Sequence, residues 1–304
     1  MSNSNTNISE SVLQAEILPA LKLGLAPLRA MSFTAVSGRP LYYGDSVIVD
    51  VVGAGNAAAS YSTTFASGNS TATGTSVTIG APLFSSWHIN PFLEGQPTVE
   101  RFLAHGRENA YMLAKGVMQL ILSEFTATNL GDTANDKIIE STANYDTETF
   151  TQARKLLRKK GVSGAIAAIH NLDYIAAIEK DAAIKNASAY GGNQLITTGE
   201  LPPVLGTTPY FTDAFPTAIS AENTGVIFTT PQTVAVAIGA AGVDPSGTEG
   251  MSGVRTVVVT DPDTGLSFNW RTWVNSDTGV HWGSVYLACG VEFLRKSAVR
   301  VVSA

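Results

Sequence analysis

Residues 47–74 read VIVDVVGAGNAAASYSTTFASGNSTATG, a stretch compatible with two quite different folds. Its first half has the form of a strand entering a G-x-G-x-x-A loop, which in dinucleotide-binding folds precedes a helix and a pyrophosphate site. That fold needs an apolar helical stripe after Gly53 and Gly55, and an acidic residue about 20 positions further on. The following residues are almost all Ala, Ser, Thr, Asn and Gly, and no acid occurs between Asp50 and Glu94. The stretch therefore argues against an NAD(P)-binding oxidoreductase, which we retain only as an alternative.

The same stretch fits the tip of a long two-stranded hairpin. Apolar and polar residues alternate again at Val77 and Ile79, after a tip formed by residues 53–74 that carries no charge. Tyr61 and Phe65 are the large apolar side chains of this tip. A two-stranded ribbon of this kind is not stable alone, so we expect it to lie on another part of the protein or on a partner.

The composition excludes several classes of protein. The 304 residues allow one large domain or two smaller ones, and a net charge of -6 with 19 Lys and Arg residues argues against tight nucleic-acid binding. Cys289 lies in the apolar run VYLACGVEF and is expected to be a small buried hydrophobe. The N-terminus MSNSNTNISES lacks the features of a signal peptide, and no apolar run approaches the ~18 residues of a membrane span. We therefore expect a protein made and kept in the cytoplasm.

Two segments of the first half show helical periodicity. Residues 9–28 carry apolar side chains close to helical spacing, with Pro19 as a break, and are expected to pack as an arm on another element. Residues 98–125 are expected to form one helix of roughly seven turns, whereas about three turns is normal in globular domains. Its apolar face comprises Val99, Phe102, Leu103, Ala110, Leu113, Ala114, Val117, Leu120 and Ile121.

A mixed helix and strand unit follows this long helix. The segment DTETFTQARKLLRKKG (146–161) has acids in its first turn, basic residues in its last turn and a terminal glycine, as a helix favours. The run GAIAAIH (164–170) predicts a buried strand, and LDYIAAIEKD (172–181) predicts a short helix. These elements indicate an α/β unit within the chain.

The C-terminal part is expected to consist mainly of strands. Residues 199–211 and 224–239 indicate turns and strands. From residue 254, three strands separated by the turns DPDTG and NSDTG predict an antiparallel meander. The predicted fold class is therefore α+β.

No constellation of residues indicates catalysis or metal binding. The four histidines lie in separate elements, and the sequence has no H-E-x-x-H, G-x-S-x-G or G-K-[ST] motif. The basic run in residues 154–160 is interpreted as the solvated C-terminal end of a helix. Trp270, Trp273 and Trp282 are interpreted as packing on the face of a sheet rather than as a platform for sugars or bases. We therefore expect no catalytic residue, no cofactor and no metal site.

The order of these elements resembles that of one protein family. An arm, a long hairpin, a long helix preceded by LFSSWHINPFLEGQPT, a compact α/β unit and a terminal meander follow one another along nearly the whole chain. This order is similar to that of the major capsid proteins of tailed double-stranded DNA phages, whose fold also forms the floor of herpesvirus shells. The resemblance rests chiefly on the long helix and on AIAAIHNLDYIAAIEKD (165–181), GELPPVLGTTPY (199–210) and YLACGV (286–291).

The resemblance implies a specific domain organisation. Residues 1–40 would form an N-terminal arm, and residues 41–84 an extended hairpin loop that lies across a neighbouring subunit. Residues 85–140 and 254–304 would form a peripheral domain with the long spine helix and the antiparallel sheet, and residues 141–253 an axial α/β domain. The residues expected to shape the hairpin and to contact the neighbour are Gly53, Gly55, Tyr61, Phe65, Gly68 and Gly74.

The resemblance also implies a function and partners. The chain would be a structural protein that assembles through pentamers and hexamers into an icosahedral shell enclosing double-stranded DNA. Its partners would be further copies of itself, a separate scaffolding protein, a portal, a decoration protein and packaged DNA held by weak non-specific contacts, with no membrane. It would reside in the virion after assembly in the host cytoplasm.

Two departures from the family are visible in the sequence. Some relatives cross-link the hairpin loop through a lysine, but this chain has none between Lys22 and Lys115, so we expect non-covalent contacts. Some relatives carry a scaffolding segment of about a hundred residues before the hairpin, and we expect this chain to have none. A β-rich surface or adhesive protein remains, with the NAD(P)-binding oxidoreductase, as an alternative.

Overall fold

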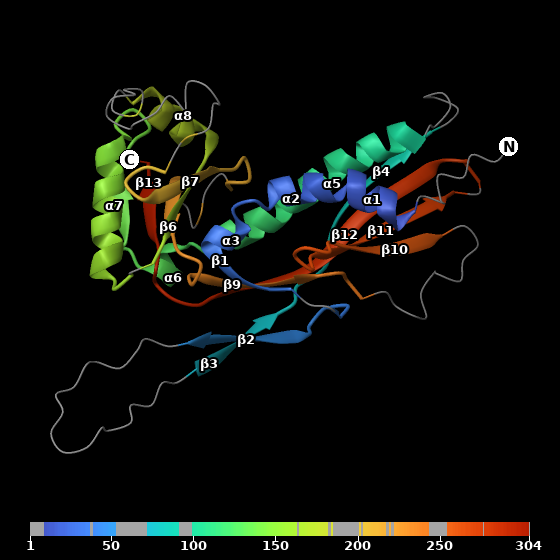
Figure 1. Ribbon diagram of the computed structural model, residues 1–304, viewed down its shortest axis with the longest axis horizontal. Helices are drawn as coiled ribbons and strands as arrows, with labels where there is room; N and C mark the ends of the chain where they lie inside the picture. Colours follow the sequence, from blue (N-terminus) through green and yellow to red (C-terminus); the bar gives the residue numbers. More distant parts are fainter. Residues whose placement is uncertain are drawn as a thin grey trace, which may run out of the picture.

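The computed structural model shows an elongated molecule of helices and sheets (Figure 1), which confirms the predicted α+β class. The residues that it describes are 9–36, 39–52, 72–90, 99–162, 164–181, 184, 201, 203–216, 219, 222–242, 254–275 and 277–303.

The first sheet contains the predicted C-terminal meander. Across the sheet the strands are β1 (Ser32–Val36), β9 (Val234–Gly239), β12 (His281–Phe293), β11 (Ser267–Val274) and β10 (Arg255–Thr260), with β4 (Leu83–Ile89) paired to β12. The antiparallel pairs β10–β11 and β11–β12 confirm the meander. Gly265 and Gly279 close its turns with φ angles of 72° and 62°, a region that glycine adopts without strain. The first half of β12 pairs with β4 and β11, and its second half pairs with β9.

One long helix, α5 (Val99–Leu122), lies along this sheet and contacts β4 and β12, as Figure 1 shows. It confirms the long helix predicted over residues 98–125, with small differences at the two ends. Its buried residues recur at helical spacing and form the centre of the largest core of the molecule. They are Phe102, Leu103, Gly106, Ala110, Leu113, Ala114, Val117, Met118, Ile121 and Leu122.

The N-terminal arm packs on α5, as the sequence predicts. It consists of α1 (Glu10–Glu16), α2 (Leu18–Gly24) and α3 (Leu28–Met31). Pro19 stands in the first turn of α2, where its missing N–H has no intrahelical partner. Ile17 and Leu21 are fully buried. A Cβ atom at Gly24 would lie 2.5 Å from that of Ala114, so a glycine is required where α2 and α5 meet.

The expectation that no segment could span a membrane was wrong in one respect. The 22 residues Glu10–Met31 are long and apolar enough by composition, with a mean hydropathy of 1.2. The arm is amphipathic, however, because Leu13, Leu21 and Met31 are fully buried in the core while Leu23 and Arg29 are exposed. The apolar composition of the arm therefore serves packing against α5 and the first sheet.

The second sheet is covered by two helices. Its order is β5 (Lys137–Ile139), β13 (Val299–Val302), β8 (Thr224–Thr229), β6 (Ile166–His170) and β7 (Thr207–Phe211), and the helices are α7 (Thr147–Lys159) and α8 (Leu172–Lys180). Asp146 caps α7 by accepting hydrogen bonds from the N–H groups of Glu148 and Thr149. Beyond the end of α7, Gly161 has a φ of 78°. The predicted helices and the buried strand β6 are thereby confirmed.

Three strands join a sheet other than the one that the predicted division of the chain assigns to them. β5 lies within residues 85–140 but pairs with β13 in the second sheet. β9 lies within residues 141–253 but pairs with β1 and β12 in the first sheet. β13 lies within residues 254–304 but pairs with β5 and β8 in the second sheet. The chain therefore crosses from one sheet to the other several times, and no single linker separates the two sheets. The division into domains stays a prediction.

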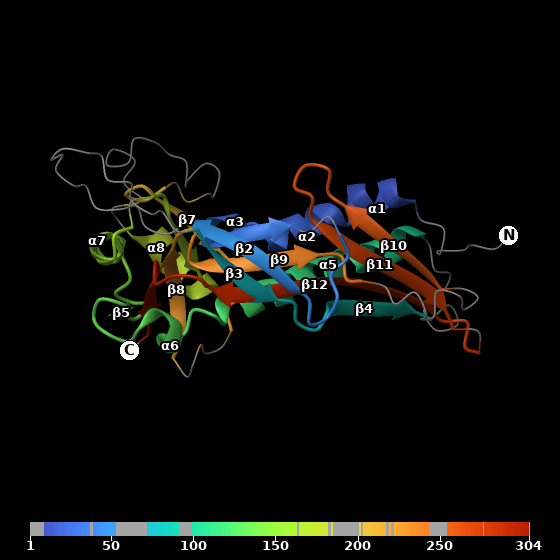
Figure 2. The ribbon, with the colours of Figure 1, turned by 90° about the horizontal axis from the view of Figure 1, so that it is seen from below.

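The predicted hairpin ribbon is present. Strands β2 (Ser46–Val52) and β3 (Ala72–Thr78) pair antiparallel from end to end as a sheet of two strands. A dinucleotide-binding strand would have parallel neighbours, so this pairing excludes that reading of the stretch. Figures 1 and 2 show the ribbon lying across β9 and β12, where Val49 and Val77 are buried. A Cβ atom at Gly290 of β12 would lie 2.4 Å from the carbonyl oxygen of Thr78, so glycine permits this close approach.

Candidate functional site

The hairpin residues named as contacts lie mostly outside the described part of the chain. Gly74 is described, in β3 opposite Asp50, whereas Gly53, Gly55, Tyr61, Phe65 and Gly68 are not. The described part of the ribbon presents apolar side chains to solvent at its base. Tyr43 is 76% exposed and Ile48 of β2 is 70% exposed. Both side chains are therefore available to a partner that packs on this ribbon.

A second exposed apolar surface lies where the arm meets the second sheet. Leu23 of α2, Leu172 of α8 and Phe211 of β7 are 69%, 53% and 66% exposed, and they line one groove of about 530 Å³. Pro27 and Pro209 complete its apolar walls. We call this surface the apolar groove. Three chain segments far apart in the sequence form it, so the sequence offered no signal for it.

One carboxylate ties α5 to the segment that follows β7. Asp213 accepts a hydrogen bond from the Tyr111 hydroxyl at 3.0 Å and one from Lys115 Nζ at 2.9 Å. Burial acts to raise the pKa of Asp213, but the hydrogen bonds from Lys115 and Tyr111 outweigh it and the pKa is lowered. The ion pair therefore holds the second sheet against the spine helix near neutral pH, rather than supplying a proton to a reaction.

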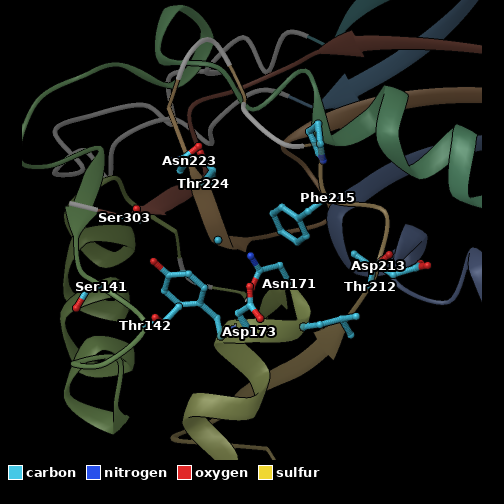
Figure 3. A pocket seen from close by; sticks show the side chains of 14 residues that line it. Ser141, Thr142, Asn171, Asp173, Thr212, Asp213, Phe215, Asn223, Thr224 and Ser303 are labelled. Atoms are coloured by element: carbon cyan, nitrogen blue, oxygen red, sulfur yellow. Dashed lines mark hydrogen bonds between the residues drawn. The ribbon is translucent and has the colours of Figure 1, made fainter.

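A polar pocket of about 460 Å³ lies beside Asp213, at the end of the second sheet (Figure 3). Its polar groups serve local structure. Asn171 caps α8 by accepting from the N–H of Tyr174 at 2.9 Å, and the Tyr174 hydroxyl donates to the carbonyl of Glu140 at 2.8 Å. Thr212 accepts from the N–H of Ala214 at 3.1 Å. The described lining contains no histidine, cysteine or lysine. Its carboxylates are Asp173 and Asp213, and Asp213 accepts hydrogen bonds from Tyr111 and Lys115.

The buried histidine is structural. His170 Nδ1 is 3.1 Å from the carbonyl oxygen of Tyr210, which can only accept, so Nδ1 carries the proton. Nε2 then accepts from the Tyr145 hydroxyl at 2.7 Å. Burial lowers the pKa of His170 to about 4, although the hydrogen bond to Tyr210 opposes the shift. The imidazole is therefore neutral in the folded protein near neutral pH and both of its nitrogens have partners.

We expect this histidine to make the folded protein sensitive to acid. The unfolded chain protonates His170 below pH about 6.5, whereas the folded chain does so only at about 4. Since the unfolded state binds the proton first, the free energy of unfolding falls as the pH falls through this window, by about 3 kcal/mol for this group. Urea unfolding at a series of pH values measures the slope. A His170→Gln variant should have a flatter profile across the same window, and equal slopes in the two proteins would contradict the assignment.

The buried position of Cys289 and the ring packing of the tryptophans confirm two interpretations made from the sequence. Cys289 is buried, and burial raises the pKa of its thiol to about 12, so it is no nucleophile. Among the described residues, no group of three or more His, Cys, Asp or Glu side chains could hold a metal ion. Trp270 is buried against Trp87, with ring centroids 5.1 Å apart, and Trp273 stacks on Trp282 at 5.7 Å on the sheet face.

A cluster of charged residues, Arg300, Glu222 and Lys137, stabilises the second sheet near β5 and β13. Arg300 of β13 is fully buried and donates hydrogen bonds to Glu222 and to the carbonyl oxygen of Gly131. Glu222 also accepts from Lys137 Nζ of β5 at 2.9 Å. Burial acts to raise the pKa of Glu222, but the bonds from Lys137 and Arg300 prevail and lower it. The cluster joins strands and loops that are far apart in the sequence.

Comparison with solved structures identifies proteins that share this architecture. No protein-family model and no curated protein matches the chain. The capsid of Ralstonia phage GP4 is 12% identical, over 90% of this chain and 86% of that chain, with a TM-score of 0.55. The capsid of cyanophage P-SCSP1u is 13% identical over 91% and 89%, with a TM-score of 0.54. A virus-like particle from Pyrococcus furiosus is 15% identical over 96% and 98%, with a TM-score of 0.51.

This chain has the fold of the tailed-phage major capsid proteins. The capsid fold confirms the resemblance seen in the sequence, and it gives no support to the oxidoreductase alternative.

Several strands of this fold were not predicted from the sequence. β4 was not predicted, because its sequence LFSSWHI alternates apolar and polar residues only at Trp87, His88 and Ile89, and Phe84 is apolar although it is exposed. The strands β1, β5 and β13 were also missed, because their partners are distant in sequence.

Proposed function

We propose that this chain is a structural major capsid protein whose copies assemble through pentamers and hexamers into an icosahedral shell enclosing double-stranded DNA. One observation carries the proposal: the likeness to capsid structures extends over 90% or more of this chain in several cases, although identity is low. The exposed apolar groove and the apolar base of the hairpin ribbon support it, since surfaces of this kind are covered when copies associate. The proposed location is the virion, after assembly in the host cytoplasm.

The proposal assigns roles to the parts of the chain. Residues 1–40 act as the arm, residues 41–84 as the extended loop that lies on a neighbouring copy, residues 85–140 and 254–304 as the peripheral domain, and residues 141–253 as the axial domain. Within the loop, the bends are set by Gly53, Gly55 and Gly68, and the neighbour is contacted by Tyr61 and Phe65. Gly74, which lies in β3 opposite Asp50, belongs to the paired ribbon. The proposed partners beyond further copies are a scaffolding protein, a portal, a decoration protein and packaged DNA. The proposed protein is no enzyme.

Negative-stain microscopy of the purified full-length protein tests the function directly. A capsid protein gives closed shells or rings of five and six copies. A protein that stays monomeric at high concentration contradicts the proposal, and fibres would favour the adhesive alternative. DNA measured in nuclease-treated shells isolated from an infected host distinguishes a genome container from an empty particle.

Shortening the hairpin is expected to abolish shell closure without unfolding the subunit. The variant replaces residues 53–71 with a two-residue turn and leaves β2 and β3 intact. The buried anchors Val49 and Val77 remain, so the thermal midpoint should change little. The loss of Tyr61 and Phe65, each of which can bury about 150–250 Å² on a partner, should prevent stable shells.

The control for this experiment retains the length of the loop. It keeps the loop unchanged except for Tyr61→Ser and Phe65→Ser, which removes the two anchors alone. Shells that form normally from the shortened variant would contradict the role of the loop. A shortened variant that does not fold would show instead that residues 53–71 belong to the core of the subunit.

A further inference from the structure

A basic surface at one end of the second sheet has no role in the function proposed so far. The sequence contains no acid between Glu148 and Asp173 and none after Glu292. Of the 19 Lys and Arg residues, five lie in the first of these segments and three in the second, which makes eight in all. The two segments meet in the structure, because the C-terminal end of α7 lies beside the residues that precede β13.

The meeting point is an open depression of about 520 Å³. Lys160, Arg295 and Lys296 line it, and none of its described lining residues is acidic. Arg158 lies at its edge, because its guanidinium donates to the carbonyl oxygen of the lining residue Val162 at 3.1 Å. We call Arg158, Lys160, Arg295 and Lys296 the basic pocket. It lies at the opposite end of the strands from the polar pocket, before β6 and β13 begin and after β8 ends.

The four cations of the basic pocket have different tasks. Lys160 is paired with Asp136 at 2.9 Å and donates to the carbonyl oxygen of Ala298 at 2.8 Å, so it fixes the end of α7 to the chain before β13. Arg158, Arg295 and Lys296 are exposed, and no salt bridge to them occurs within the described residues. They therefore carry the uncompensated positive charge of this surface.

The loop that carries two of these cations is held in place. The N–H of Leu294 donates to the carbonyl oxygen of Thr233 at 2.9 Å, and the hydroxyls of Thr233 and Ser297 are 2.8 Å apart. Arg295 also donates to the side-chain oxygen of Gln232 at 3.0 Å. The backbone of this loop and the Arg295 guanidinium are thus held relative to the sheet, which lowers the entropy lost when an anion binds.

The surroundings of the basic pocket favour a phosphate backbone over a protein. Protein interfaces are centred on buried aromatic and apolar anchors. None of the large apolar side chains exposed on the described surface lines this pocket. A Cβ atom added at Gly161 or Gly164 would meet nothing within 4 Å, so the surface is open to a long ligand rather than closed around a small one. A solvated polyanion with regularly spaced charges fits such a surface.

We propose that the basic pocket contacts the phosphate backbone of duplex DNA without reading its sequence. The inference rests on the proposed function, since a shell that encloses DNA brings this ligand to every subunit. Three uncompensated cations give weak and strongly salt-dependent binding, with dissociation constants on the order of 10⁻⁴–10⁻⁶ M. This is compatible with the net charge of -6, which argues only against tight binding.

Binding to a labelled duplex of about 30 base pairs tests the inference, measured by fluorescence anisotropy on unassembled full-length subunits at about 50 to 200 mM salt. The variant Arg295→Gln/Lys296→Gln removes two exposed cations. We expect its affinity at the lowest salt to fall at least about tenfold, and the slope of log affinity against log salt to decrease by about 1.8. The matched control, Arg29→Gln/Lys180→Gln, removes the same charge from exposed positions elsewhere and should change affinity less than about twofold.

Each outcome decides for or against the basic pocket. Equal losses in the two double variants would show that only net charge matters, and unchanged binding in the pocket variant would overturn the inference directly. A poly-glutamate peptide of equal charge that binds intact subunits more tightly than the duplex would also overturn it, in favour of an acidic protein partner. The pocket variant should still form shells. Failure of the intact chain to form shells would instead contradict the proposed function.

Discussion

Replacing Trp270 with alanine is expected to lower the free energy of unfolding by about 3–5 kcal/mol. Trp270 is 2% exposed and lies between β11 and α5, where its ring centroid is 5.1 Å from that of Trp87 and 6.0 Å from that of Phe102. A Cβ atom at Gly106 of α5 would lie 2.7 Å from the Trp270 ring, so the helix approaches as closely as a glycine allows. Truncation leaves a cavity that such a closely packed site cannot fill by small shifts.

Urea unfolding of the full-length subunit measures this effect. The control is Trp273→Ala on the same strand, where the ring is partly exposed and stacks on Trp282. Its loss should cost no more than about 1.5 kcal/mol, because solvent replaces part of the lost contact. Equal effects at the two positions would show that the face of the sheet opposite Trp270 contributes as much as the packing against α5.

Replacing Arg300 with methionine is expected to lower the free energy of unfolding by about 3 kcal/mol. The guanidinium is fully buried and its partners, Glu222 and the carbonyl of Gly131, lose their donor. Lys137 still pairs with Glu222 at 2.9 Å, so part of the charge remains compensated and the loss lies at the low end of the range for broken buried pairs.

Two further variants separate the buried charge from the simple loss of an arginine. Arg295→Met changes an exposed arginine on the preceding loop and should alter stability by less than about 0.5 kcal/mol. Adding Glu222→Gln to Arg300→Met should recover part of the loss, because the carboxylate that Lys137 compensates only in part is then replaced by a neutral amide. An Arg300→Met protein as stable as the parent would show that the cluster is not needed at this edge of the sheet.

The sequence predicted the hairpin, but it predicted neither the basic pocket nor the apolar groove. Alternation on both sides of residues 53–74 predicted the hairpin, because strand periodicity is a property of neighbouring residues. The sequence showed the basic residues at the end of α7, and we interpreted them as a solvated helix end. It could not show that Arg295 and Lys296, more than a hundred residues away, lie beside them. Leu23, Leu172 and Phe211 are unremarkable in their own segments and form a groove only when α2, α8 and β7 meet.

The sequence by itself determined the elements whose signals are local. The helical stripe of α5, the cap and terminal glycine of α7, and the glycine turns of the meander each depend on residues within a few positions of one another. Only the tertiary structure decided that β12 pairs with β9 through its second half and with β4 and β11 through its first half. It also decided that β13, which follows the meander in sequence, belongs to the second sheet. Strand pairing depends on which buried faces meet across long separations, and the local pattern of a short apolar strand fits many partners equally well.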